Sequence, residues 1–229
     1  MKLSSDTITV LKNFSTINQN LQIGKGSSIS TMSAMKNIVA KAEVKEKFVR
    51  EFAIYDLNEF LSALSLFEKP DLTFKDDFVM MTESNAAATK SLKYWYSDPS
   101  VVSTPTKEPE MPECEISFNL SSAMLSDVTK ASHVIGAPDM CLEGMDLGTA
   151  VLKVTDKKNT TANDYAVKLE IDNQEENVPY KFWFKVENLK LIPGKYDVNV
   201  SSKRISHFWN EKVNVQYWIA LEPESAYNA

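Results

Sequence analysis

Apolar residues recur at every third position near the start of the chain, a spacing that gathers them on one face of an α-helix. They are Ile8, Leu11, Phe14 and Ile17. Ser5 or Asp6 is placed to cap this helix, because short oxygen-bearing side chains accept hydrogen bonds from its first free N–H groups. A second helix is predicted to begin after Asp56 and to end before Pro70, since the residue before a proline disfavours helical geometry.

Between and after these helices, polar and apolar residues alternate with a period of two. The alternation covers residues 21–55 and returns in short runs at 72–74, 78–81 and 92–96. This period is typical of strands that bury one face. The first half of the chain therefore predicts two helices packed on antiparallel strands.

The same order of patterns returns in the second half. A strand at 116–120 precedes a helix that Ser121 or Ser122 caps, and a short second helix at 186–191 ends before Pro193. Further strands are predicted at 145–154, 165–171, 180–184, 196–201, 205–209 and 213–221. The two halves therefore look like repeats of one unit of helix, strands, helix and strands.

Residues 97–113 separate the halves and differ from both in composition. The segment is rich in proline, which has no backbone N–H donor, and it contains four acidic residues and only one lysine. Such a segment favours an extended connector over a helix or a central strand. The chain is therefore predicted to be an α+β protein of two similar domains, residues 1–96 and 114–229, each with two helices packed on antiparallel sheet.

Charge and composition exclude several classes of protein. A net charge of −6 argues against a nucleic-acid binder that uses its whole surface, so any contact with DNA must be local. No apolar run approaches the roughly 18 residues of a membrane span, and the first residues lack the apolar stretch of a secretory signal. We expect an intracellular protein that does not contact a membrane. Its two cysteines are too few for a disulfide framework or a zinc site.

Catalytic motifs are scarce. Residues 24–27 (Gly-Lys-Gly-Ser) lack the upstream glycine of a phosphate-binding loop and the hydroxyl residue that should follow its lysine, so they predict a hairpin turn. Ser33 and Lys36 have the spacing of a serine–lysine hydrolase but lie among strand-like residues. The two histidines, His133 and His207, fall on separate elements. We expect no catalytic site, no metal and no cofactor.

Several separate blocks, in order along the chain, resemble one family. They are residues 1–7 (MKLSSDT), 11–18 (LKNFSTIN), 53–61 (AIYDLNEFL), 98–100 (DPS), 193–196 (PGKY) and 219–222 (IALE). Together with the chain length and the central proline-rich connector, they resemble the DNA polymerase sliding clamps of T-even-type bacteriophages. The resemblance spans the whole chain and is weakest at 24–51 and 137–177.

The resemblance implies the DNA-clamp fold in a ring-shaped homotrimer around duplex DNA, with helices lining the hole and sheets forming the outer wall. It implies a processivity factor that tethers the replicative DNA polymerase, with a clamp loader and transcription proteins as further partners, in the cytoplasm of an infected bacterial host. A ring holds DNA by its topology and needs only weak, sequence-independent attraction to phosphates, which suits an acidic protein. The alternative is a phage structural or assembly protein with two β-rich domains.

Basic residues at exposed positions of the predicted helices are the candidates for the DNA-facing surface. Glu59, Asp127 and Glu187 lie on the same helices and weaken the positive field. The alternative role of each lysine is ordinary solubility. The candidates are Lys12, Lys130, Lys185 and Lys190 on the helices, with Lys2 at the N-terminus and His133 when protonated.

A second surface follows from the resemblance. Clamps of this type bind short hydrophobic tails of the polymerase and other partners in a pocket beside the connector and the C-terminal segment. In this chain the corresponding residues are Val101, Val102, Ile219, Leu221 and Pro223. The alternative is that the valines pin the connector and the others fill the core. Ring closure also requires two edge strands to meet, and the sequence does not say which.

Overall fold

The computed structural model describes residues 1–86, 88–144, 146–172 and 178–228. Contacts divide the chain into two units, the first built mainly from Met1–Glu108 and the second from most of the chain after Pro109. This division falls inside the predicted connector, residues 97–113. Each unit is described by itself.

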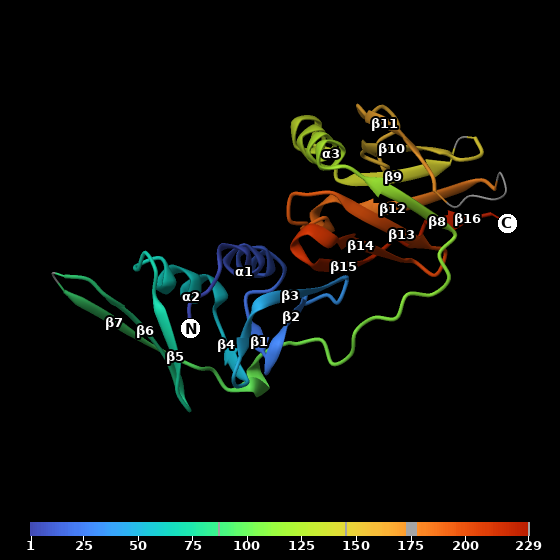
Figure 1. The fold of residues 1–229 in the computed structure, drawn as a ribbon. Coiled ribbons are helices and arrows are strands. Elements are labelled where there is room, and N and C mark those ends of the chain that lie inside the picture. The colour runs from blue at the N-terminus through green and yellow to red at the C-terminus, as the bar shows by residue number, and fades with distance from the viewer. Residues whose placement is uncertain (87, 145, 173–177, 229) are drawn as a thin grey trace. The chain divides into compact units, whose positions relative to one another are not determined.

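Among its described residues, the first unit has two α-helices and two groups of antiparallel strands (Figure 1). The helices are α1 (Ser5–Ile17) and α2 (Leu57–Leu64). One group of strands runs in the order β4-β1-β2-β3, and a three-stranded sheet runs β5-β6-β7. Their bounds are β1 Leu21–Ile23, β2 Gly26–Met32, β3 Ile38–Phe48, β4 Phe52–Ile54, β5 Asp71–Phe74, β6 Phe78–Ser84 and β7 Thr89–Trp95. The predicted helices and strands of this half are thereby confirmed.

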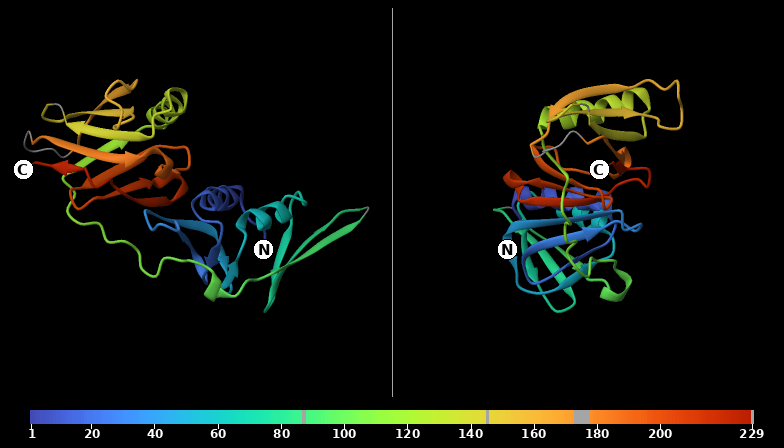
Figure 2. Two further views of the ribbon diagram at one scale, coloured as in Figure 1. Left: turned by 180° about the vertical axis from the view of Figure 1, so that it is seen from behind. Right: turned by 90° about the vertical axis from the view of Figure 1, so that its right-hand side faces the viewer.

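Local chemistry fixes where these helices begin. Asp56 caps α2, as predicted, by accepting hydrogen bonds from the backbone N–H groups of Asn58 and Glu59 at 2.9 and 3.0 Å. The cap of α1 is Ser4, one residue before the predicted Ser5, and its hydroxyl accepts from Thr7 N–H at 3.3 Å. Figures 1 and 2 show α1 and α2 lying side by side.

A buried carboxylate holds the start of α1. Glu46, on β3, accepts hydrogen bonds from the backbone N–H of Ser4 and from the Thr7 hydroxyl. Burial alone raises the pKa of Glu46, but these hydrogen bonds outweigh burial and hold the pKa below its ordinary value. Glu46 is therefore ionised at neutral pH and ties the helix to the sheet.

Replacing Glu46 with alanine should lower the free energy of unfolding by about 1–3 kcal/mol, because two donors at the start of α1 lose their partner. The carboxylate contributes above its ordinary pKa and loses that contribution as the pH falls through the lowered value, so the variant should show a weaker loss of stability in acid. Urea titrations across a pH series measure both effects. Glu43→Ala, at an exposed position of the same strand, is the control.

The second unit is built from one α-helix and two sheets among its described residues. Its helix is α3 (Ser122–Ile135), which packs on β10 and β11 and is capped by Ser121 as predicted (Figure 1). The strand orders are β15-β14-β13-β8 and β11-β10-β9-β12-β16, all antiparallel. The bounds are β8 Ile116–Leu120, β9 Asp139–Gly144, β10 Thr149–Thr155, β11 Tyr165–Glu170, β12 Tyr180–Lys185, β13 Tyr196–Ser201, β14 Ile205–Asn210, β15 Val215–Ala220 and β16 Ala226–Tyr227.

Two predictions for this half need correction. The first concerns strand β9, which the sequence did not predict. Its first four residues are all buried, so the strand shows no alternation of polar and apolar positions. The predicted strand at 145–154 begins only at Thr149 among the described residues, and Met145 lies outside them.

The second correction concerns the short helix predicted at 186–191. The chain forms only a three-residue 3-10 turn there, η2 (Val186–Asn188). In the first half the equivalent helix is capped by Asp56, but Lys185 stands at the matching position and makes no capping hydrogen bond, since an ammonium group has no acceptor. Among the described residues, the two halves therefore differ in helix content, with α1 and α2 in the first and only α3 in the second.

Candidate functional site

The outward face of α1 carries a single lysine among short hydroxyl side chains. Thr9, Ser15 and Thr16 direct their hydroxyls back to carbonyl oxygens of the same helix. Lys12 is exposed and makes no ion pair with any residue that the structure describes. Lys2, before the helix, lies 3.6 Å from the Asp71 carboxylate. Lys12 is therefore the stronger of the two candidates for phosphate contact.

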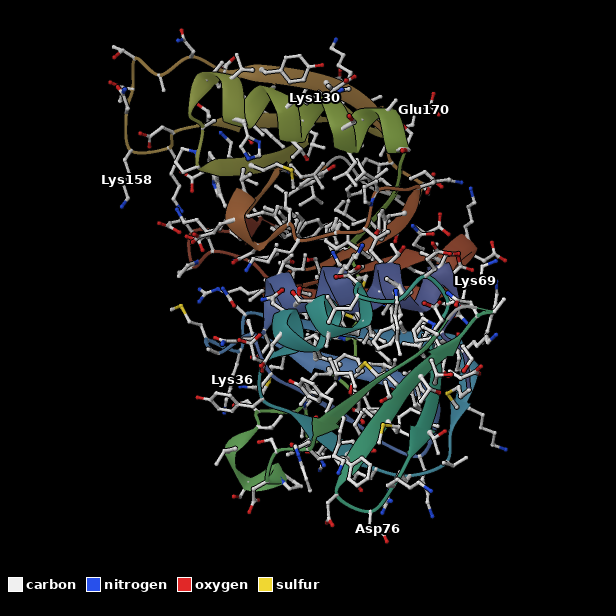
Figure 3. The ribbon with its side chains drawn as sticks, turned by 90° about the vertical axis from the view of Figure 1, so that its left-hand side faces the viewer. Lys36, Lys69, Asp76, Lys130, Lys158 and Glu170 are labelled. Carbon is white, nitrogen blue, oxygen red and sulfur yellow. The ribbon has the colours of Figure 1, made fainter. Side chains whose placement is uncertain are left out.

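The corresponding face of α3 carries Lys130 and His133. Lys130 is exposed and has no ion-pair partner within the described part of the chain (Figure 3). His133 is also exposed, and its Nδ1 donates to the Thr129 carbonyl oxygen at 2.7 Å. This bond fixes the ring and leaves Nε2 for another partner. Asp127, on the same helix, is exposed and reduces the local positive charge.

A cavity of about 600 Å³ lies between the end of α3 and η2. His133, Lys185 and Lys190 all line it, so the structure brings together three of the six predicted DNA-facing residues. Glu187 also lines the cavity and offsets part of their charge. His133 keeps the exposed helix position that the sequence predicted, whereas Lys185 and Lys190 lie outside any α-helix and line the hollow.

Lys185 differs from the prediction in both position and environment. It is the last residue of β12 rather than a helix residue, and its side chain is only 25% exposed. Its ammonium lies 2.6 Å from the carboxylate of the buried Asp139, and this hydrogen bond raises the pKa of Lys185. The positive charge of Lys185 is therefore paired with the buried Asp139 carboxylate.

The connector residues proposed for partner binding lie in the first unit. Val101 ends the 3-10 turn η1 (Pro99–Val101), and its side chain is 54% exposed, whereas Val102 is half-buried. Asp98 caps the turn by accepting from Ser100 N–H at 2.8 Å. An exposed apolar side chain on a capped turn is available to a partner.

The C-terminal residues proposed for the same role belong to the second unit, and two of them are core residues. Ile219 is 0% exposed and Leu221 is 6% exposed, so neither presents a surface to a partner. Pro223 is exposed. The sequence does hold a signal that Ile219 and Leu221 are core residues. Apolar residues recur with a period of two from Val215 through Tyr217 to Leu221, and alternate strand residues share one face.

Sequence reasoning could not identify the sheet edges, and the structure does. Other parts of the chain make backbone hydrogen bonds to the outer side of four strands. Met1 bonds to β5, Ser97 to β4, Asp172 to β8 and strand β16 to β12. The strands β7 and β11 end their sheets with no hydrogen-bonded neighbour on the outer side among the described residues.

Hydrogen bonds at the ends of β7 and β11 show which backbone groups point outward. Tyr96 N–H donates to Asp77 at 2.9 Å and Ile171 N–H donates to Gly148 at 2.9 Å. Because inward and outward residues alternate in an antiparallel pair, the outward groups belong to Ser91, Lys93 and Trp95 on β7 and to Ala166, Lys168 and Glu170 on β11. Trp95 is also 60% exposed, with Lys93 Nζ 5.2 Å from its ring centroid.

The described residues offer neither a metal-binding cluster nor a helix that could span a membrane. No cluster of histidine, cysteine, aspartate or glutamate is arranged to hold a metal ion. None of the described helices combines the length and the apolar character required to cross a membrane.

Comparisons with known proteins match both halves of the chain. The family described as DNA polymerase processivity factor matches residues 4–101, and the family described as gp45 sliding clamp, C terminal, matches residues 117–223. The sliding clamp of Vibrio phage KVP40 is 32% identical over 97% of this chain and 99% of its own. The sliding clamp of Escherichia phage RB69 is 29% identical over the whole of both chains.

Solved structures with the same fold are more distant in sequence. Proliferating Cellular Nuclear Antigen from Entamoeba histolytica superposes with a TM-score of 0.71 at 15% identity, over 96% of this chain and 97% of that one. The protein of the same name from Thermococcus kodakaraensis gives 0.72 at 12% identity, over 97% and 99%. At such low identities these matches establish the fold alone, and the predicted α+β clamp fold is confirmed.

Proposed function

Because the chain belongs to the DNA polymerase processivity factor family of sliding clamps, we propose that it forms a ring around duplex DNA and tethers a DNA polymerase to its template. The observation that carries this proposal is that the matches with the family cover both halves in order and run through nearly the whole chain. Processivity factors of this family are not enzymes, which confirms the expectation drawn from the sequence. The alternative of a structural or assembly protein is set aside.

The DNA-facing surface consists of residues on α1, on α3 and around the cavity beside η2. Lys12 and Lys130 supply positive charge with no ion-pair partner among the described residues, and Lys190, with His133 when protonated, lies at the cavity. Lys2 and Lys185 contribute less, because each lies against a carboxylate. A few mobile lysines attract phosphates weakly and without reading sequence, which lets a ring slide.

The ring is a homotrimer closed by β7 of one subunit and β11 of the next. Both strands offer outward N–H and C=O groups, and a head-to-tail contact of two different edges generates a closed ring. Trp95, exposed on β7, supplies apolar surface to that contact. The contact buries two edges that would otherwise invite aggregation.

Partner proteins bind at Val101 and Val102 of the connector and at Pro223 of the C-terminal segment. The polymerase, a clamp loader and transcription proteins are the proposed partners. The protein acts in the cytoplasm of an infected host, in keeping with the phage origin of its relatives. The domain boundaries that organise these surfaces are 1–96, 97–113 and 114–229.

The proposed function is tested by mass and by DNA topology. At high concentration the protein should sediment as a trimer. When a clamp loader places it on DNA, it should remain on closed circular DNA and be lost once the circle is cut, because only a ring can run off an end. Equal retention on circular and linear DNA would overturn the proposal.

Val101→Glu should weaken the binding of a polymerase C-terminal peptide by about tenfold or more, because a charge placed in a desolvated contact is costly. Fluorescence anisotropy of a labelled peptide measures the affinity. Val49→Glu is the matched control, since Val49 is an exposed valine outside the connector. Wild-type affinity in a Val101→Glu trimer of normal mass would place the pocket elsewhere.

A further inference from the structure

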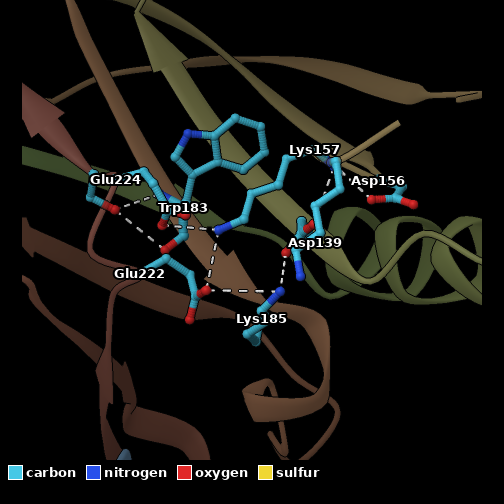
Figure 4. A network of polar contacts seen from close by, with 9 residues as sticks. Asp139, Asp156, Lys157, Trp183, Lys185, Glu222 and Glu224 are labelled. Atoms are coloured by element: carbon cyan, nitrogen blue, oxygen red, sulfur yellow. Dashed lines mark hydrogen bonds and ion pairs between the residues drawn. The ribbon is translucent and has the colours of Figure 1, made fainter. Parts of the chain in front are cut away.

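The C-terminal segment is held by a lysine that lies between two of its carboxylates. Lys157 Nζ is 3.2 Å from Glu222 and 3.1 Å from Glu224, the residues on either side of Pro223 (Figure 4). The Lys157 side chain is only 11% exposed, and its Nζ lies 5.8 Å from the ring centroid of Trp183. A lysine so enclosed contacts both ends of the short Glu-Pro-Glu stretch at once.

Lys157 is itself fixed by a second, more deeply buried pair. Asp139 is 1% exposed and accepts from the Lys157 backbone N–H at 3.2 Å and from Lys185 Nζ at 2.6 Å. Lys185 Nζ also lies 3.8 Å from Glu222. The network therefore joins the start of β9, the loop after β10, the end of β12 and the C-terminal segment (Figure 4).

The backbone of the C-terminal segment is attached to β12 by a short ladder. Glu222 N–H donates to the Trp183 carbonyl at 2.8 Å, and Trp183 N–H donates to the Ser225 hydroxyl at 2.8 Å. The strand β16 has only two residues, paired with Tyr180 and Lys181. So short a strand has few ladder bonds, and the ion pairs of Glu222 and Glu224 add to the attachment of the segment just before it.

Lys157 and Glu224, which form one ion pair of the network, are both charged at neutral pH. Burial lowers the pKa of Lys157, but hydrogen bonds to Glu224 and Glu222 outweigh burial and raise it above its ordinary value. Hydrogen bonds, including the one from Lys157, lower the pKa of Glu224. The ion pair between Lys157 and Glu224 therefore persists at neutral pH.

We propose that Lys157 is a positioning residue for partner binding: it holds Glu222 and Glu224 in place and so fixes Pro223 as a rigid part of the partner surface. This inference rests on the proposed function, because it assumes that partners contact Pro223. Without Lys157 the segment is less ordered before a partner binds, and the cost of ordering it on binding lowers affinity.

The test compares Lys157→Met, which keeps most of the aliphatic stem and removes the charge, with Lys157→Arg and Lys158→Met. Lys158 is the adjacent, exposed lysine and serves as the matched control. In Lys157→Met, amide hydrogen exchange of residues 222–228 should accelerate about tenfold or more, and the Kd for a labelled C-terminal peptide of the cognate DNA polymerase should rise by a similar factor. Lys157→Arg should restore both, and trimer mass should not change.

The outcomes separate this inference from the proposed function. If the wild-type protein does not bind the peptide, partner binding at the C-terminal segment is overturned. If the wild type binds, and Lys157→Met loosens the segment without changing Kd, the positioning role of Lys157 is overturned while the proposed function stands. Should Lys157→Met fail to fold, Glu224→Gln, at an exposed carboxylate, removes one ion pair and must show the same two changes to a smaller degree.

Discussion

A variant with Lys12→Glu and Lys130→Glu is expected to lose processive DNA synthesis by about tenfold or more, with its fold and trimeric mass intact. Each substitution replaces attraction to phosphates with repulsion, and a trimer carries every change three times. The slope of log affinity against log salt should become shallower by about 0.9 for each phosphate contact that is lost. Stability should change by less than about 0.5 kcal/mol, because both side chains are exposed on helix surfaces.

The measurement is the length of product synthesised on primed circular DNA in the presence of a clamp loader, at several salt concentrations. Lys36→Glu with Lys158→Glu is the control, because it makes the same change of charge at exposed lysines outside the helices. If the control and the double variant lose processivity equally, the effect comes from net charge. If neither loses it at moderate salt, Lys12 and Lys130 do not face DNA.

Regular periodicity made much of this fold predictable. The helices around Phe14, Leu57 and Leu125 have strong apolar faces, and two of the predicted caps, Asp56 and Ser121, are the residues that cap them. Strand β9 escaped prediction because its first four residues are all buried. The helix predicted at 186–191 failed on one local detail, the replacement of a capping carboxylate by Lys185.

The candidate site was less predictable, because it depends on contacts between residues far apart in the chain. Lys157 and Glu222 are separated by 65 positions, and nothing in the pattern of either segment indicates that they pair. Lys185 and Lys12 were both predicted to face DNA from exposed helix positions, but in the structure Lys185 ends strand β12 and pairs with the buried Asp139. The exposure of Trp95 likewise follows from the arrangement of the sheets.

Ser91→Pro is expected to dissociate the proposed trimer, and with it to abolish stable retention on circular DNA. Ser91 lies on β7 with its N–H directed outward, so proline removes a donor from the free edge without removing a bond between β6 and β7. The unfolding midpoint should therefore fall little. The trimer, in contrast, loses a hydrogen bond at each subunit contact, and the proline side chain clashes with the neighbouring strand there.

Ser91→Ala is the matched control, because it removes the same hydroxyl and keeps the N–H. Sedimentation across a dilution series should show trimer for the wild type and Ser91→Ala, and monomer for Ser91→Pro at concentrations where the others stay assembled. Lys168→Pro, on the outer side of β11, should have the same effect, since the proposed contact pairs the two edges. A Ser91→Pro protein that remains a trimer at every concentration would exclude β7 as the closing edge, and a defect in only one of the two proline variants would exclude the pairing of β7 with β11.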